Sequence, residues 1–145
     1  MSSDGMKIHG YIMAIVTHPD MTREVRVAPN LIMTEGFDHY LDAQFGTEPA
    51  RGTFLAIGTK ATGLAVGDAA LEGEVDRKGG TYTHTNNTAQ GTVAYTFSTG
   101  GPWAIVEMGL LDADAAGTLI CRGTFAAVNK GTADSFEGKY IHSLS

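Results

Sequence analysis

Residues 93–125 decide the fold class, and they read VAYTFSTGGPWAIVEMGLLDADAAGTLICRGTF. The first five residues alternate between apolar and small or polar side chains, which is the pattern of a strand with one buried face. A Gly-Gly-Pro turn follows at 100–102, and the apolar stretch 103–111 is long enough for a second strand. The polar stretch 112–117 predicts a hairpin loop before a third strand. Strands joined by turns as short as these indicate antiparallel β structure.

Further strands are expected on both sides of this stretch, at intervals typical of an antiparallel sandwich. The sequence predicts them at 6–16, 22–28, 54–57, 80–85 and 136–144. The chain of 145 residues contains 19 Gly and 4 Pro, which suits short strands separated by turns. We therefore predict a mainly β protein, an antiparallel β-sandwich or barrel of the jelly-roll kind, in a single domain over 1–145. Within it, 1–28 is expected to form an N-terminal hairpin or arm that precedes a sandwich core at 30–145.

One short helix is expected, over residues 34–45. Phe37, Tyr40, Leu41 and Phe45 fall on one face of a helix at this position, and we expect this face to pack against a sheet. Thr34 is a candidate N-cap, and Gly46 is expected to end the helix with a positive φ angle.

The charge balance bears on possible partners. Charged residues make up 18% of the chain, below the proportion of about 25% in an ordinary soluble domain, and this favours a surface that is covered in an assembly. The net charge is −6 and the ten Lys and Arg residues are scattered, so the chain lacks the basic face that phosphate binding needs. Because the sequence contains no run of 18 apolar residues, we expect no membrane span.

Cys121 is the only cysteine, which excludes an internal disulfide and a cysteine-based zinc site. The polar start of the chain, 1–5, does not have the layout of a signal peptide. Synthesis in a reducing cytoplasm is therefore expected.

No residue pattern in the sequence points to catalysis, a metal or a cofactor. The five histidines show no ligand spacing, and Cys121 lies in an apolar strand, where a buried small side chain is expected. The acidic residues between 68 and 76 are expected to be solvated or to pair with Arg77 or Lys78. We therefore expect a protein that is not an enzyme and that needs no cofactor.

Two glutamates and two arginines lie among apolar neighbours, where an unpaired charge is unfavourable. Glu107 or Glu74 is therefore expected to form an ion pair with Arg122 or Arg77, inside or beside the sheet.

A series of short motifs follows in order between residues 30 and 135. They are NLI at 30–32, FLAIGT at 54–59, GDAALEGEVDR at 67–77, VAYTF at 93–97, EMGLLD at 107–112, GTLICRGTF at 117–125 and VNKG at 128–131. The ordered set resembles a family of small virion structural proteins of tailed bacteriophages, the capsid decoration and tail-associated proteins. Met108 and Leu111 stand where the family often has Ala and Phe, and residues 1–29 match no part of it.

The resemblance implies a non-enzymatic, β-rich module of a virus particle, made in the cytoplasm of the bacterial host. The function that we expect first is capsid decoration, in which the protein lies on the exterior of the shell, contacts the major capsid protein and stabilises the head. The alternatives are a tail, neck or fibre-associated structural protein and a carbohydrate-binding attachment module. The last would need an exposed aromatic platform, and the only Trp, Trp103, follows Gly-Gly-Pro into an apolar strand, where burial is expected. No direct contact with nucleic acid or membrane is expected.

Assembly contacts are expected from two stretches of the chain. In the N-terminal hairpin they are Tyr11, Ile12 and Met13, and in the strand at 93–97 they are Ala94 and Thr96, which alternate with side chains that point inward. We expect a homotrimer, because members of families like this one sit on local three-fold positions of an icosahedral shell.

Overall fold

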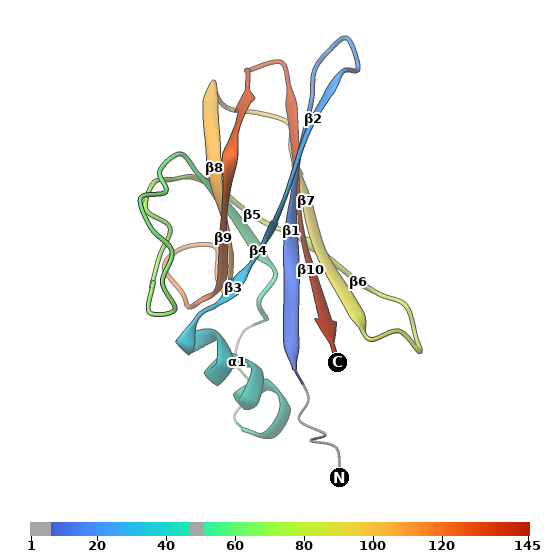
Figure 1. Ribbon diagram of the computed structural model, residues 1–145, viewed down its shortest axis with the longest axis vertical. Helices are drawn as coiled ribbons and strands as arrows, with labels where there is room; N and C mark the ends of the chain where they lie inside the picture. Colours follow the sequence, from blue (N-terminus) through green and yellow to red (C-terminus); the bar gives the residue numbers. More distant parts are fainter. Residues whose placement is uncertain (1–6, 47–50) are drawn as a thin grey trace.

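The computed structural model describes residues 7–46 and 51–145. Two five-stranded antiparallel sheets pack face to face, and one helix lies at the end of the sandwich near the N-terminus of the first strand (Figure 1). This confirms the prediction of a mainly β sandwich with one short helix, and the sheets do not close into a barrel.

The two sheets draw their strands from different parts of the chain. Sheet A has the order β2 (Arg23–Pro29), β1 (Ile8–Thr17), β10 (Ser135–Leu144), β7 (Gln90–Phe97) and β6 (Thr81–His84). Sheet B has the order β3 (Leu31–Ile32), β9 (Leu119–Lys130), β8 (Trp103–Leu111), β4 (Phe54–Gly58) and β5 (Glu74–Gly79). The helix α1 (Thr34–Phe45) follows β3.

The chain changes sheets at both sides of the sandwich. It passes from β2 to β3 at Asn30 on one side, and from β5 to β6 at Gly80 on the other (Figure 1). Gly80 is needed at its corner, because a Cβ there would meet the Val93 side chain at 2.8 Å. The edge strands of the two sheets are thus covalently joined at both sides.

The N-terminal hairpin is an integral part of sheet A, which corrects the expectation of an arm before a separate core at 30–145. β1 lies between β2 and β10 and pairs with β10 along its whole length. Ile12, Ala14 and Val16 of β1 are fully buried in the core. Removing 1–28 would take two of the five strands from sheet A, so a folded remainder is not expected.

Both sheets contribute large side chains to the space between them. The fully buried ones include Ile12, Leu55, Ile105, Met108, Phe136 and Tyr140. The Tyr140 hydroxyl donates a hydrogen bond of 2.7 Å to the Met108 carbonyl oxygen, which ties β10 in sheet A to β8 in sheet B. The core is therefore continuous across the two layers.

The helix has the predicted bounds, but of the predicted apolar face only Tyr40 packs against the core of the sandwich. Phe37, Leu41 and Phe45 are exposed, and the buried position is Gly36, which lies against the backbone of Ile120. The N-cap position belongs to Met33, whose side chain makes no capping hydrogen bond, and not to Thr34. The C-terminal residue Gly46 has φ −114°, so the expected positive φ angle is also wrong. No helix in the described residues is long and apolar enough to span a membrane.

Candidate interaction surface

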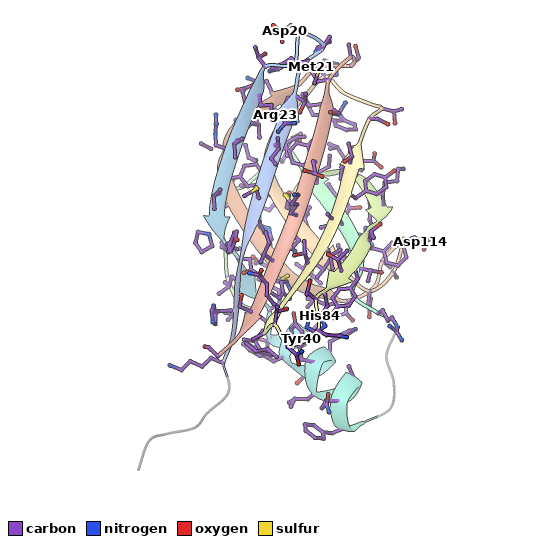
Figure 2. The ribbon with its side chains drawn as sticks, turned by 90° about the vertical axis from the view of Figure 1, so that its right-hand side faces the viewer. Asp20, Met21, Arg23, Tyr40, His84 and Asp114 are labelled. Atoms are coloured by element: carbon purple, nitrogen blue, oxygen red, sulfur yellow. The ribbon has the colours of Figure 1, made fainter. Side chains whose placement is uncertain are left out.

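The outer face of sheet A is the side of that sheet that points away from sheet B. Figure 2 looks onto this face, with the strands running side by side in the order β2, β1, β10, β7 and β6. The register places the side chains in rows across the strands. One row contains Val27, Met13, Lys139 and Ala94, and the next contains Val25, Ile15, Glu137 and Thr96.

The apolar half of this face lies on β1 and β2. Val25 is 47% exposed, Val27 is 59% exposed and Tyr11 is 38% exposed. Met13 and Ile15 lie between them and are partly exposed. Large apolar side chains in adjacent positions on an exposed sheet face are typical of a surface that is covered in an assembly.

β2 directs Val25 and Val27 to the outer face together with Arg23, whereas the half-buried Glu24 and Arg26 lie on the face toward sheet B. Glu24 accepts a contact of 3.0 Å from the His18 ring, and Arg26 donates a hydrogen bond of 3.3 Å to the Ala127 carbonyl oxygen of β9. A strand with one solvated face usually has the opposite orientation. The inversion leaves Val25 and Val27 on the outer face and strengthens the case for a partner there.

The structure places four of the five predicted assembly residues on the outer face of sheet A. Tyr11 and Met13 point outward from β1, and Ala94 and Thr96 point outward from β7. Ile12 is the exception, because it points into the core and is fully buried. Its side chain cannot contact a partner unless the sandwich opens, so the proposal of Ile12 as an assembly contact is corrected.

Sequence reasoning missed Val25, Val27, Glu137 and Lys139 as surface residues. The alternation in residues 22–28 was visible, but alternation alone does not say which set of side chains faces the core. Glu137 and Lys139 lie on the same face of β10, with 3.6 Å between the Lys139 Nζ and a Glu137 carboxylate oxygen. No motif marks these two residues.

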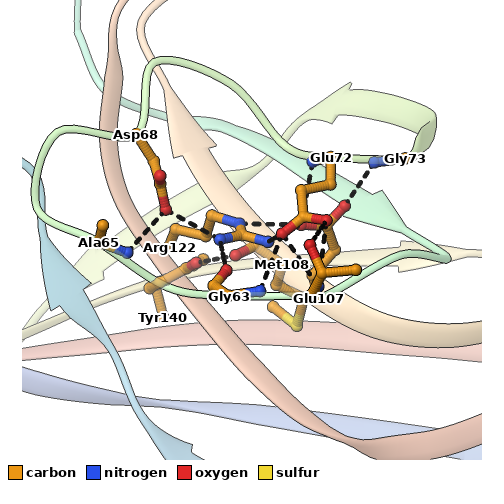
Figure 3. Close-up of polar contacts among 10 residues, drawn as sticks. Gly63, Ala65, Asp68, Glu72, Gly73, Glu107, Met108, Arg122 and Tyr140 are labelled. Carbon is orange, nitrogen blue, oxygen red and sulfur yellow. Dashed lines mark hydrogen bonds and ion pairs between the residues drawn. The ribbon is translucent and has the colours of Figure 1, made fainter.

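The structure brings Glu107 and Arg122 together in a buried ionic cluster behind the loop between β4 and β5 (Figure 3). The Arg122 Nη2 lies 2.7 Å from Glu107 Oε2, and both side chains are almost completely buried. Arg122 also pairs with Asp68 at 2.9 Å and with Glu72 at 3.2 Å. Asp68 and Glu72 therefore bind Arg122, and not Arg77 or Lys78 as expected for the acidic run.

Backbone donors complete this cluster. The Glu107 carboxylate accepts hydrogen bonds from the backbone N–H groups of Gly73 and Glu72, at 2.9 and 3.3 Å. Hydrogen bonds from the Thr62 hydroxyl and backbone, and from the Gly63 N–H group, lower the pKa of Glu72 to about 2. All four charged side chains hold the β4–β5 loop in place, so the role that the geometry supports is structural.

The structure also brings Glu74 and Arg77 together, at the edge of sheet B. Arg77 binds both carboxylate oxygens of Glu74, at 2.7 and 3.0 Å, and donates to the carbonyl oxygens of Ala113 and Ala116. This pair ties β5 to the hairpin loop between β8 and β9. Asp76 pairs with Lys78 at 3.0 Å, as the sequence predicts for the acidic run.

Cys121 lies next to His142, a contact that the sequence does not predict. Its Sγ is 3.7 Å from His142 Nε2, and His142 Nδ1 is 2.7 Å from the Tyr40 hydroxyl of α1. Cys121 is fully buried, as predicted, and burial raises the pKa of its thiol to about 12. A neutral, inaccessible thiol is a poor nucleophile. The contacts from Cys121 through His142 to Tyr40 have a structural role, because they connect the helix to both sheets.

An exposed aromatic platform for a sugar is not found at Trp103. This ring packs on Gly100, and the Lys130 ammonium lies 5.7 Å from its centroid. Within residues 7–46 and 51–145, no group of three His, Cys, Asp or Glu side chains is placed to hold a metal ion.

Comparisons with protein families, with curated proteins and with solved structures found no match to the chain.

Proposed function

We propose that the chain is a non-enzymatic structural protein of a tailed-bacteriophage virion, and that it decorates the exterior of the capsid. The observation that carries the proposal is the outer face of sheet A, where Val25 and Val27 point to solvent beside Tyr11 and Met13. The ordered motifs between residues 30 and 135, which resemble virion structural proteins, give the class of assembly.

A decoration protein stabilises a shell by the surface area that it buries, and the outer face of sheet A can supply such area. Apolar surface removed from water contributes about 25 cal/mol per Å². A stable protein–protein interface buries on the order of 1,600 Å² in total. The major capsid protein and further copies of this chain are the partners that we propose, and the homotrimer stays a prediction.

The rest of the fold fits a rigid structural module. The chain passes from one sheet to the other at both sides of the sandwich. The Arg122 cluster fixes the β4–β5 loop, the longest loop in the described residues, to sheet B. A rigid module loses little conformational entropy when it binds, so more of the contact energy is available to the assembly.

The number of copies in the virion tests this proposal. Virions purified from the phage that encodes the chain are analysed by quantitative mass spectrometry, with the major capsid protein as the internal standard. We expect copies on the order of hundreds, in proportion to the capsomers. A few to a few dozen copies would assign the protein to the tail or neck, and its absence from purified virions would overturn the proposal.

A further inference from the structure

We infer that a second copy of this chain covers the outer face of sheet A. The two copies are related by a two-fold axis that lies in the plane of the contact and runs across the strands. The axis passes between the row of Met13 and the row of Ile15. This inference rests on the proposed function and names the partner of the same surface.

The register makes the face self-complementary about this axis. A rotation of 180° places each strand over its own copy, running in the opposite direction. The row of Val27, Met13, Lys139 and Ala94 then lies over the partner's row of Val25, Ile15, Glu137 and Thr96. Apolar side chains of β1 and β2 meet apolar side chains, and small side chains of β7 meet small side chains.

The charges on the face determine the choice of axis. Lys139 and Glu137 lie two residues apart on β10, and the rotation puts each one over its opposite charge in the partner. Their side chains are long enough to meet across the spacing of about 10 Å between packed sheets. An axis parallel to the strands that runs along the central strand β10 would instead place Lys139 over Lys139 and Glu137 over Glu137.

The end of the face agrees with the same operation. Arg23 lies in register with Thr17 and Ser135, and the rotation places this row over the partner's row of Pro29, Tyr11 and Ile141. That row contains no basic side chain, so the pairing brings no cations together there.

The face has the size that a dimer needs. β1 and β10 contain ten residues each. At about 3.3 Å per residue and about 4.8 Å between strands, the five strands of sheet A form a face of roughly 33 by 20 Å. This is the scale of the area, about 800 Å² per partner, that a stable interface buries. The two-fold pair differs from the homotrimer expected from the sequence, and mass measurements separate the two.

Charge reversal tests the pairing. The purified full-length protein is measured by size-exclusion chromatography with light scattering, alongside the variants Lys139→Glu and Glu137→Lys. We expect a dimer for the original chain. Each variant alone places like charges against each other across the axis, and its dimer should be about 10- to 100-fold weaker. An equimolar mixture of the two variants restores opposite charges across the axis, so the dimer should return.

Affinity retention, a double variant, a control variant and circular dichroism complete the test. A tagged Lys139→Glu protein should retain untagged Glu137→Lys on an affinity column and should not retain untagged Lys139→Glu. The double variant Glu137→Lys/Lys139→Glu should recover the dimer. Lys78→Glu is the matched control, because it reverses the lysine of an exposed ion pair on sheet B and should leave the mass unchanged. Circular dichroism establishes that each variant is folded.

A monomer or a trimer of the original chain would overturn the inference, as would a mixture of the two variants that stays monomeric. Each of these results would leave the virion copy number unaffected, so the inference can fail while the proposed function stands. If the protein dimerises as described but is absent from virions, the proposed function fails while the dimer inference stands.

Discussion

At the scale of single residues, Arg122 is the side chain on which most charged contacts converge. Three carboxylates, those of Glu107, Asp68 and Glu72, lie within ion-pair distance of its guanidinium. Glu107 is fully buried, so the loss of Arg122 leaves a carboxylate without a counter-charge inside the protein. Removing one partner of a buried ion pair is strongly destabilising, because it leaves the other charge buried without a partner. The loss of stability is larger than the net stabilisation that the intact pair gives compared with apolar side chains in its place.

We predict that Arg122→Met lowers the free energy of unfolding by about 3–5 kcal/mol at pH 7. The measurement is urea unfolding followed by circular dichroism. Arg51→Met is the control, because Arg51 is exposed and its loss should change stability by less than about 0.5 kcal/mol. A loss below about 1 kcal/mol for Arg122→Met would contradict the structural role of the cluster.

Two histidines should give stability opposite pH dependences. Hydrogen bonds from the His18 ring to Asp134 and then Glu24 raise the pKa of His18 above 6.5. Burial lowers the pKa of His142, which lies among Cys121, Tyr40 and Tyr140. Folded protein therefore holds the His18 proton more tightly than unfolded protein does, and holds the His142 proton less tightly.

We predict that the contribution of His18 is complete below pH 6.5 and is lost as pH rises through its raised pKa. The contribution of His142 runs the other way, because stability falls as pH drops below 6.5 and the unfolded state gains the proton first. Histidine titration by NMR checks both directions. His18→Gln should remove the decline above pH 6.5, while the exposed control His9→Gln should keep it; a His18 pKa at or below 6.5 would contradict the prediction.

At the scale of elements, the attachment of α1 depends on Gly36. A Cβ at this position would overlap the Ile120 carbonyl oxygen, which belongs to the backbone of β9 and cannot turn aside. Ala ordinarily stabilises a helix by about 1 kcal/mol relative to Gly. The close approach of α1 to β9 reverses that preference here.

We predict that Gly36→Ala lowers the free energy of unfolding by about 1–3 kcal/mol, because the helix must move off Ile120. Chemical denaturation measures the change. Gln44→Ala is the control in the same helix, since Gln44 is exposed and the substitution should be neutral or slightly stabilising. A gain in stability from Gly36→Ala would show that α1 does not pack on β9 in this way.

The positions of most strands could be predicted from alternation and turn residues, and the bounds of β8 and α1 agree with the prediction. β5 could not be predicted, because its charged sequence EVDRKG looks like a solvated loop until Arg77 and Lys78 are paired. The packing of Tyr40 agrees with the prediction, but the burial of α1 at Gly36 could not be predicted. Its burial depends on a glycine contact with Ile120, which leaves no apolar pattern in the sequence.

The pairs Glu74–Arg77 and Glu107–Arg122 follow from the rule that charges among apolar residues need partners. That rule does not predict the ion pairs of Asp68 and Glu72 with Arg122, because these pairs depend on the path of the β4–β5 loop. The rule does not predict the orientation of β2 either. Alternation gives two faces, and only the pairing with β1 shows that Val25 and Val27 lie outside.

At the scale of the whole molecule, the outer face of sheet A should matter for assembly and little for folding. Val27 is 59% exposed, so we predict that Val27→Lys changes the free energy of unfolding by less than about 1 kcal/mol. The same substitution places an unpaired charge in the proposed interface and should reduce incorporation into virions by at least about 10-fold. Quantitative mass spectrometry of purified particles measures the incorporation.

Val66→Lys is the matched control for this prediction. Val66 is 52% exposed, but it lies in the β4–β5 loop and not on sheet A. Its variant should be incorporated as well as the original chain. If both variants are incorporated into virions equally well, the outer face of sheet A does not take part in assembly.

The most direct test of the central claim is a cryo-EM map of the purified virion. The account predicts density for the β-sandwich on the exterior of the head, with the outer face of sheet A covered by a protein neighbour in every copy and Val25 and Val27 inside that contact. A map in which this face is open to solvent in every copy, or in which the head carries no such sandwich, would contradict it.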